Sequence, residues 1–209
     1  MRNRILLAMA LLAGVSQLGC GDSGGGGTCA PFSACGGDPT GKWAIDGVCA
    51  EGNLAETMFA QTGLPAACSG VYQNVEMNLG GIVEYANGVQ TSNVDYLMTL
   101  RVRYTPECLA AIAGAPLTAT QYLCDSIASG MTDSSGMTGS CVLSNNGCDC
   151  DLSISKNASA STTYTLSGST LTNAGGAVSQ ICVSGDKLTV RGESGIGSVR
   201  MQFTAHRSP

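Results

Sequence analysis

Alternation of apolar and polar residues dominates this chain from about residue 71 onward. The clearest run covers residues 94–104, where one face is apolar and the other is mostly polar. The apolar face carries Val94, Tyr96, Met98, Leu100, Val102 and Tyr104. Successive side chains of a β-strand point to opposite faces of the sheet, so this run predicts a half-buried strand in an antiparallel sheet over one core.

Shorter runs of the same kind precede and follow this strand. They lie at 43–47, 71–79, 82–85, 150–154, 164–166, 181–183, 188–190 and 199–205. Asn87-Gly88 predicts a tight hairpin, because both positions tolerate the positive φ of a type I′ turn. We also expect turns at Gly80-Gly81, Gly168 and Gly185. The pattern predicts a mainly β fold, an antiparallel up-and-down meander closed or half-closed as a barrel, with a β-sandwich as the alternative.

A helical insert is expected to interrupt the sheet at about residues 105–130. Thr105-Pro106 has the form of an N-cap followed by the first helical residue, and Gly114 would end that helix. Thr118 and Gln121 fit a capping box for a second helix that ends near residue 130. Residues 131–147 are rich in Ser, Gly and Asn and predict a loop.

The first 20 residues have the parts of an export signal. Arg2 and Arg4 precede the apolar run 5–15, which is too short for a bilayer-spanning helix of about 20 residues. Leu18-Gly19-Cys20 resembles a bacterial lipobox, although Gln17 replaces the usual Leu. The resemblance implies a signal peptide at 1–19, a lipid on Cys20 and cleavage before it. An ordinary secretory signal is the alternative. If the chain is cut before Cys20, we expect residues 20–28 to form a lipidated, glycine-rich tether and residues 29–209 to form a disulfide-braced β domain.

The cysteine count supports export. The chain has 11 cysteines, and lipidation of Cys20 would leave an even number. In an oxidising compartment these are expected to form up to five disulfides. They are Cys29, Cys35, Cys49, Cys68, Cys108, Cys124, Cys141, Cys148, Cys150 and Cys182. Connectivity does not follow from the sequence, and the local layout suggests Cys29–Cys35, Cys49–Cys68, Cys108–Cys124, Cys141–Cys148 and Cys150–Cys182.

Charge excludes one class of partner. Loss of Arg2 and Arg4 with the signal takes the formal net charge from −5 to −7. Nucleic acids need a basic protein surface, so we expect no nucleic-acid partner. The expected address is the cell envelope, with the outer membrane favoured because Gly21 follows Cys20.

Gly41-Lys42-Trp43 at the start of the first strand resembles the G-x-W signature of lipocalins. The resemblance implies that Trp43 closes one barrel end, with Arg200 or Arg191 packed over its ring. The whole chain resembles the cysteine-rich lipoproteins of predatory soil bacteria such as myxobacteria. That resemblance rests on the lipobox, the glycine tether, Gly41-x-Trp43, Cys148-x-Cys150 and the paired late strand segments 164–168 and 181–188. It implies place and fold, not activity.

Candidate catalytic groups are sparse. His206 is the only histidine and stands near the C-terminus, where a general base is poorly held. Asp149 and Asp151 could belong to a Ca²⁺ loop, but the sequence has no EF-hand spacing, so we favour their interpretation as solvated turn residues. Glu76 and Glu84 could meet across a Gly80-Gly81 hairpin, but exposed strand residues are favoured. We therefore expect no catalytic residues, no metal and no cofactor.

The expected function is an envelope-anchored binding or structural module that resembles a lipocalin. Its partners would be the membrane, through Cys20, and an apolar small molecule or an envelope protein. The alternative is a surface interaction protein, such as an adhesin or protease inhibitor. An envelope hydrolase is less favoured.

Overall fold

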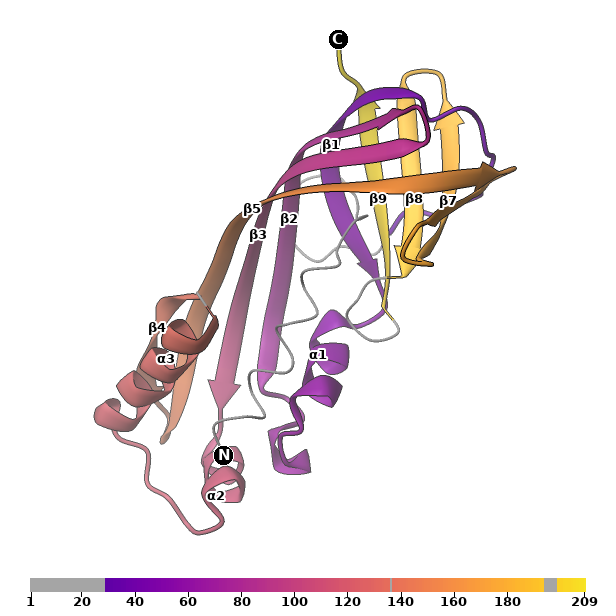
Figure 1. Ribbon diagram of the computed structural model, residues 1–209. Coiled ribbons are helices and arrows are strands. Elements are labelled where there is room, and N and C mark those ends of the chain that lie inside the picture. The colour runs from indigo at the N-terminus through magenta and orange to yellow at the C-terminus, as the bar shows by residue number, and fades with distance from the viewer. Residues whose placement is uncertain (1–28, 136, 194–198) are drawn as a thin grey trace. The chain divides into compact units, whose positions relative to one another are not determined.

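The structure is a computed structural model that describes residues 29–135, 137–193 and 199–209 (Figure 1). The expected signal peptide, Cys20 and the tether 20–28 lie outside these residues. The strands are β1 (Gly41–Glu51), β2 (Tyr72–Ala86), β3 (Val89–Tyr104), β4 (Thr138–Ser144), β5 (Gly147–Ser167), β6 (Thr170–Asn173), β7 (Val178–Ser184), β8 (Lys187–Glu193) and β9 (Arg200–Arg207). The helices are α1 (Leu54–Thr62), the 3-10 helix η3 (Ala66–Cys68), α2 (Pro106–Ala113) and α3 (Gln121–Ser135).

The strands form one antiparallel sheet that returns on itself. Its order is β3-β2-β1-β9-β8-β7-β6-β5-β4, and an additional pairing of β3 with β5 closes a ring of eight strands. β4 stands outside this ring and pairs with β5. The predicted mainly β antiparallel meander is therefore confirmed. Among the described residues, no helix has the length and apolar character needed to cross a bilayer.

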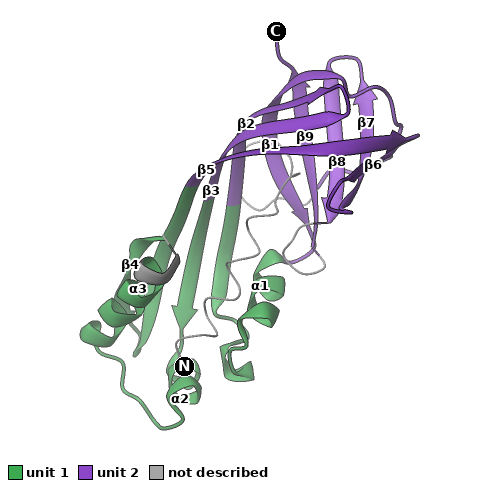
Figure 2. Cartoon of the chain, viewed as in Figure 1, with its two compact units in different colours: residues 1–13, 54–76, 98–155 green, residues 14–53, 77–97, 156–209 purple. Residues whose placement is uncertain are grey.

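Contacts divide the chain into two compact units (Figure 2). Unit 1 contains residues 54–76 and 98–155, with the helices and β4. Among the described residues, unit 2 contains 29–53, 77–97, 156–193 and 199–209, with β1 and β6 to β9. The strands β2, β3 and β5 are long enough to contribute to both units.

The hairpin at Asn87-Gly88 is confirmed. Asn87 has φ 52° and Gly88 has φ 72°, as a type I′ turn requires. The expected turn at Gly80-Gly81 is wrong, because β2 continues through it. Gly81 has φ 109°, and a Cβ there would collide with the backbone of Asn93 and Val94. Glycine is required here for a close approach of two strands, which the sequence pattern alone does not separate from a turn.

The predicted helical insert is present but longer than expected. The Thr105 hydroxyl accepts a hydrogen bond from the Cys108 amide at 3.2 Å, and Gly114 ends α2 with φ 73°. Thr120, not Thr118, caps α3, because its hydroxyl accepts from the Leu123 amide at 3.2 Å. The predicted loop 131–147 is wrong: α3 continues to residue 135 and β4 follows. The helix α1 was not predicted from the sequence.

Gln121 has a different task from the predicted one. Its Nε2 donates to the Cys141 carbonyl at 3.0 Å, and its Oε1 accepts from the Leu143 amide at 2.9 Å. The side-chain amide thus pairs with backbone groups of β4 as a neighbouring strand would. Uncovered strand edges can pair with other chains, and the Gln121 side chain covers part of the β4 edge.

Candidate functional site

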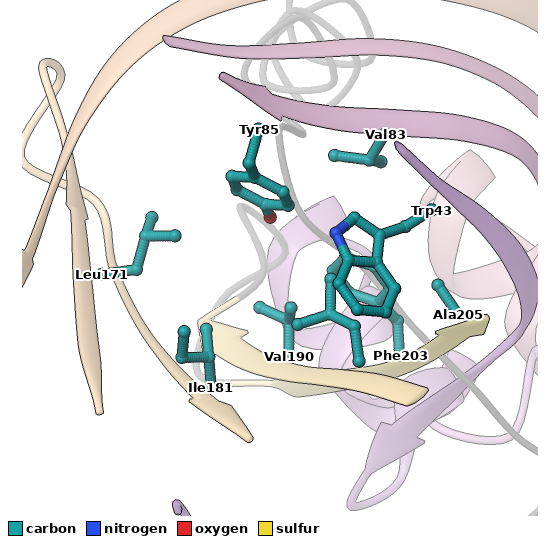
Figure 3. Close-up of a cluster of buried hydrophobic side chains, with 9 residues drawn as sticks. Trp43, Val83, Tyr85, Leu171, Ile181, Val190, Phe203 and Ala205 are labelled. Carbon is teal, nitrogen blue, oxygen red and sulfur yellow. The ribbon is translucent and has the colours of Figure 1, made fainter. Parts of the chain in front are cut away.

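The inner face of unit 2 is filled by packed side chains (Figure 3). Trp43 and Tyr85 have no exposed surface, and Phe203 is 1% exposed. The other buried members of this core are Val83, Leu171, Ile181, Leu188, Val190 and Ala205. They come from β1, β2, β6, β7, β8 and β9, so all these strands contribute to one close-packed interior.

Arg207 closes one end of this core. Its Cζ lies 4.5 Å from the centroid of the Trp43 ring, and its Nη1 donates to the Thr40 carbonyl at 3.1 Å. Trp43 Nε1 donates to the Pro39 carbonyl at 2.6 Å. The predicted packing of Arg200 on Trp43 is wrong. Because β1 and β9 are antiparallel, Trp43 lies opposite Arg207, whereas Arg200 lies opposite Glu51 at the other end of both strands.

Arg191, the second candidate for the Trp43 ring, lies on the outer face of unit 2. Its Nη2 donates to Glu51 Oε2 at 2.6 Å, and its Cζ lies 5.8 Å from the centroid of the Phe32 ring. Its Nε is buried without a hydrogen-bond partner among the described residues, as is Oε1 of Gln202, the residue opposite it on β9. Residues 29–35, which we call the strap, are bonded to β1 through Cys29 and to β7 through Cys35, and Phe32 between them lies beside Arg191 of β8.

Tyr85 places a hydroxyl in the apolar interior. Its ring meets the edge of Tyr164, with centroids 5.4 Å apart, and its hydroxyl has no hydrogen-bond partner among the described residues. Desolvation, followed by the neighbouring Tyr164, holds the pKa of Tyr85 well above its ordinary value. This buried phenol is a polar group without a compensating contact.

All ten expected cysteines form disulfides, so the predicted set is confirmed. The five pairings suggested by the local layout are wrong. The bridges are Cys29–Cys49, Cys35–Cys182, Cys68–Cys108, Cys124–Cys148 and Cys141–Cys150. Two bridges lie within unit 2 and three within unit 1. Each unit therefore has its own covalent bracing.

The pairings follow from the fold, not from nearness in sequence. Cys141 lies directly opposite Cys150 in the β4–β5 ladder. The nearby Cys148, also on β5, bonds instead to Cys124 of α3. Cys35 reaches Cys182 because Gly36 forms a parallel bridge to β7 beside it. A local guess fails here because strand register and tertiary packing determine which thiols meet.

The outer face of unit 2 carries a groove of about 590 Å³. Seven of its nine lining residues have polar side chains, but most of the lining surface belongs to apolar atoms. The lining residues are Lys42, Ile82, Glu84, Thr91, Ser92, Asn93, Ser159, Ala160 and Ser161. Lys42 Nζ and Glu84 Oε2 form an exposed ion pair at 3.9 Å on one wall. The Ser159 hydroxyl donates to the Asn93 amide oxygen at 3.1 Å. Such a lining can exchange hydrogen bonds with a polar ligand.

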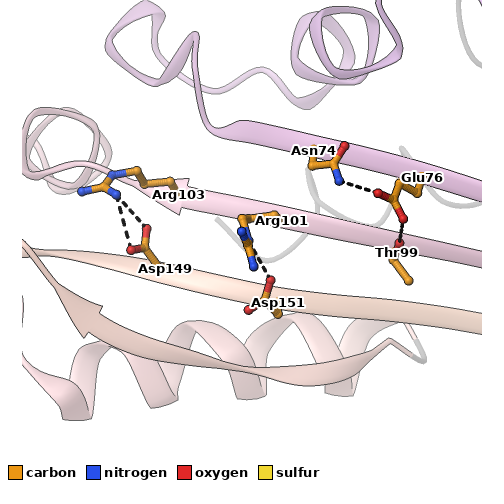
Figure 4. A network of polar contacts seen from close by, with 7 residues as sticks. All are labelled: Asn74, Glu76, Thr99, Arg101, Arg103, Asp149 and Asp151. Carbon is orange, nitrogen blue, oxygen red and sulfur yellow. Dashed lines mark hydrogen bonds and ion pairs between the residues drawn. The ribbon is translucent and has the colours of Figure 1, made fainter. Parts of the chain in front are cut away.

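The favoured interpretation of Asp149 and Asp151 as turn residues is wrong, because both lie on β5, where each forms an ion pair (Figure 4). Asp149 pairs with Arg103 at 3.3 Å, and Asp151 pairs with Arg101 at 3.0 Å. The hydrogen bond to Asp151, followed by its charge, raises the pKa of Arg101. These contacts join β3 to β5 across the face of unit 1.

The possible carboxylate pair of Glu76 and Glu84 does not form. Since β2 does not turn at Gly80-Gly81, both carboxylates stay on one extended strand, eight residues apart. Glu76 accepts hydrogen bonds from Asn74 at 2.8 Å and Thr99 at 3.4 Å (Figure 4). Glu84 lies beside Lys42. The favoured interpretation as strand residues on a solvated face is correct.

His206 is held more firmly than its place near the C-terminus predicts. It lies inside β9, opposite Ala44 of β1 and Lys187 of β8. A β-bulge between Ile45 and Gly47 inserts Asp46 as an extra residue, and Asp46 Oδ1 lies 2.5 Å from His206 Nδ1. The side chains of His206 and Asp46 are 60% and 43% exposed. Asp46 thus orients the imidazole of His206, and both side chains lie on an open surface.

Metal ligation was not expected, and the described residues hold no group of three His, Cys, Asp or Glu side chains that could bind an ion. Neither Arg207 nor the groove was predicted from the sequence. The contact of Arg207 with Trp43 could have been predicted, because a closed meander that starts near Trp43 and ends at residue 207 brings those two ends together. The groove carries no motif, since Ser, Thr and Asn also occupy ordinary solvated strand faces. The chain matches no protein-family model, no curated protein and no solved structure.

Proposed function

We propose that this chain is an envelope lipoprotein, held in a membrane by lipid on Cys20, whose β domain is a binding or structural module and not an enzyme. The five disulfides indicate an oxidising, exported environment. One observation carries the proposal further. The ten cysteines from Cys29 to Cys182 all pair with one another, so none of them is available to Cys20 as a disulfide partner.

A test of the anchor uses the full chain expressed in a bacterium and labelled with an alkyne analogue of palmitate. The protein should carry the label and sediment with membranes, since several acyl chains on one residue give stable anchoring. Cys20→Ser should lose the label and leave the membrane fraction. Thr28→Ser, a matched change outside the lipobox, should retain both properties. A Cys20→Ser protein that stays labelled and membrane-bound would refute the proposal.

The outer groove combines polar side chains with apolar surface. The interior position expected for an apolar ligand is occupied by Trp43, Tyr85 and Phe203, which belong to one packed core. The groove offers hydroxyl and amide groups and one ion pair, which suit the hydrogen-bonding surface of an envelope glycan. We therefore propose that the partner binds in this groove on the outer face of unit 2. The proposed location of the lipoprotein is the outer membrane.

A binding experiment uses purified residues 21–209 and soluble fragments of envelope glycan. Thr91→Tyr and Ser161→Tyr place bulky rings in the groove and should abolish binding. Thr172→Tyr, on β6 outside the groove, should leave binding unchanged. Glycan binding that survives both groove substitutions would exclude the groove. A surface interaction protein that binds other proteins is the alternative, and tight binding of an envelope protein with no glycan binding would favour it.

A further inference from the structure

The strap lies across four strands of unit 2 and is bonded at both ends. Cys29 is bonded to Cys49 on β1, and Cys35 is bonded to Cys182 on β7. In the sheet, Cys49 lies opposite Gln202 of β9, Gln202 opposite Arg191 of β8, and Arg191 opposite Gln180 of β7. Phe32, halfway along the strap, lies by Arg191. The strap thus begins at this row on β1, passes Arg191 of β8 and ends on β7 at Cys182, two residues from Gln180.

The first disulfide determines where the chain leaves the domain. Cys29 is bonded to Cys49 of β1, and the nine residues 20–28 are all that the proposed mature chain has before Cys29. Without the Cys29–Cys49 bond, the bonded part of the chain would begin at Cys35. The chain would then emerge over β7, three strands away in the ring.

The length of this segment limits which wall of unit 2 can approach a membrane. In the ring of eight strands, β6 lies four strands from β1 in either direction. Eight tilted strands about 4.8 Å apart, with side chains extending about 5 Å outward, give a path of roughly 40 Å around the outside from β1 to β6. Nine residues span at most about 30 Å. Residues 20–28 are therefore too short to bring β6 to the membrane as long as Cys29 is bonded to β1.

We infer that the wall of unit 2 around β1 faces the lipid surface, that the wall around β6 faces away from it, and that the Cys29–Cys49 disulfide sets this orientation. The inference rests on the proposed lipid anchor at Cys20. Charge near the exit permits the approach: Glu51 pairs with Arg191, and Arg200 lies opposite both Glu51 and Glu193. Two acidic and two basic side chains leave no excess negative charge among these four residues to repel anionic lipid.

Loss of the Cys29–Cys49 bond should reverse the orientation. The exit then lies over β7, directly beside β6, and the 15 residues from Cys20 to Ala34 span up to about 50 Å. The β6 wall can then approach the membrane without any path around the ring. The same residues of the domain would face opposite directions in the two forms.

The experiment uses the full lipidated chain in vesicles of phosphatidylethanolamine and phosphatidylglycerol that contain a lipid with a quenching headgroup. A genetically encoded fluorescent amino acid is placed at Ala44 of β1 or at Thr172 of β6, two half-buried positions on the outer face. Quenching at Ala44 should exceed that at Thr172 by about twofold or more, because the short segment holds β1 near the lipid. Equal quenching, or stronger quenching at Thr172, would overturn the inference.

Three variants make the test specific. Cys29→Ser with Cys49→Ser should reverse the order of quenching, and an unchanged order would contradict the role of that disulfide. Cys141→Ser with Cys150→Ser removes a disulfide of unit 1 and should leave the order unchanged. If the first variant does not fold, nine Gly and Ser residues inserted after Gly27 should abolish the difference. Protein that fails to float with vesicles would refute the anchor, whereas floating protein with equal quenching would refute only the orientation.

Discussion

Arg207 and Trp43 are direct cross-strand partners at the last residue of β9 and the third residue of β1, and the guanidinium lies over the indole ring. This contact joins the two ends of the folded chain. Trp43 is fully buried and also donates to the Pro39 carbonyl, so the pair fixes the segment that precedes β1.

Arg207→Met should destabilise the protein by about 1–2 kcal/mol, because it removes a cation–π contact and a hydrogen bond to the Thr40 carbonyl. Urea unfolding followed by Trp43 fluorescence measures the loss. Arg200→Met is the matched control on the same strand and should change stability by less than about 0.5 kcal/mol. Equal effects of the two substitutions would show that the contact with Trp43 contributes nothing.

Tyr85→Phe should leave the free energy of unfolding unchanged or raise it by up to about 1 kcal/mol. The substitution removes a buried hydroxyl that has no hydrogen-bond partner among the described residues and keeps the ring that packs on Tyr164. Tyr85→Ala should cost about 3–5 kcal/mol through the cavity it leaves. Thermal unfolding of both variants gives the comparison. A loss of more than about 1 kcal/mol in Tyr85→Phe would indicate a partner for the hydroxyl.

The protein should lose stability as the pH rises above about 10, the ordinary pKa of tyrosine. Desolvation by burial raises the pKa of Tyr96 to about 12 and raises the pKa of Tyr85 and Tyr104 as well. The folded protein therefore keeps protons that the unfolded chain loses. This stabilisation is complete below about pH 10 and is lost as the pH rises toward the folded-state pKa values.

Urea midpoints measured between about pH 8 and about pH 11.5 test this dependence, because the range brackets the ordinary tyrosine pKa. Tyr85→Phe should make the alkaline decline shallower, because one of the raised groups is gone. Tyr122→Phe is the control, since Tyr122 is 82% exposed. A midpoint that stays constant over the whole range would contradict the burial of these phenols.

The disulfides should differ in how much they stabilise the fold. Cys35–Cys182 spans 147 residues and Cys141–Cys150 spans 9. In the chain-entropy account, these loop lengths correspond to about 5 and about 2.6 kcal/mol. The first value is an upper value, because other bridges already shorten the loop in the unfolded chain. Paired Cys→Ser variants compared by urea unfolding should follow this order, and the reverse order would contradict the pairing.

Gln121→Ala should uncover the edge of β4. The substitution removes both bonds that join the side-chain amide to Cys141 and Leu143. We expect a loss of about 1–2 kcal/mol and faster aggregation on heating, since an uncovered strand edge can pair with another chain. Gln121→Glu keeps the acceptor for the Leu143 amide but loses the donor to Cys141, so its effect should be intermediate. Light scattering during thermal unfolding measures the aggregation, and unchanged behaviour of Gln121→Ala would show that the edge is protected by other means.

The sheet was predictable from the sequence because alternation is a local signal. The Val94-to-Tyr104 run and Asn87-Gly88 each determine their own conformation, and both are found where expected. Prediction failed where a residue's role depends on a distant strand. Gly81 is glycine because β3 passes close to it, and Arg207 contacts Trp43 because the last strand pairs with the first.

The cysteines show the same difference between what local sequence determines and what depends on distant strands. Their even number after Cys20 predicted five bridges, which depends only on composition and compartment. Their pairing needed the register of β4 against β5 and the path of the strap to β7, which no local pattern contains. The groove was missed for a similar reason, since Thr91 and Ser161 become neighbours only through the pairing of β3 with β5.

The mass of the native protein, measured without reduction, tests the central claim most directly. A chain that begins at Cys20, carries acyl groups there, and is ten hydrogens lighter than its reduced form is the predicted result, with peptides linked as Cys29–Cys49, Cys35–Cys182, Cys68–Cys108, Cys124–Cys148 and Cys141–Cys150. A mature chain with an unmodified Cys20, or with free thiols among the other ten cysteines, would contradict the account.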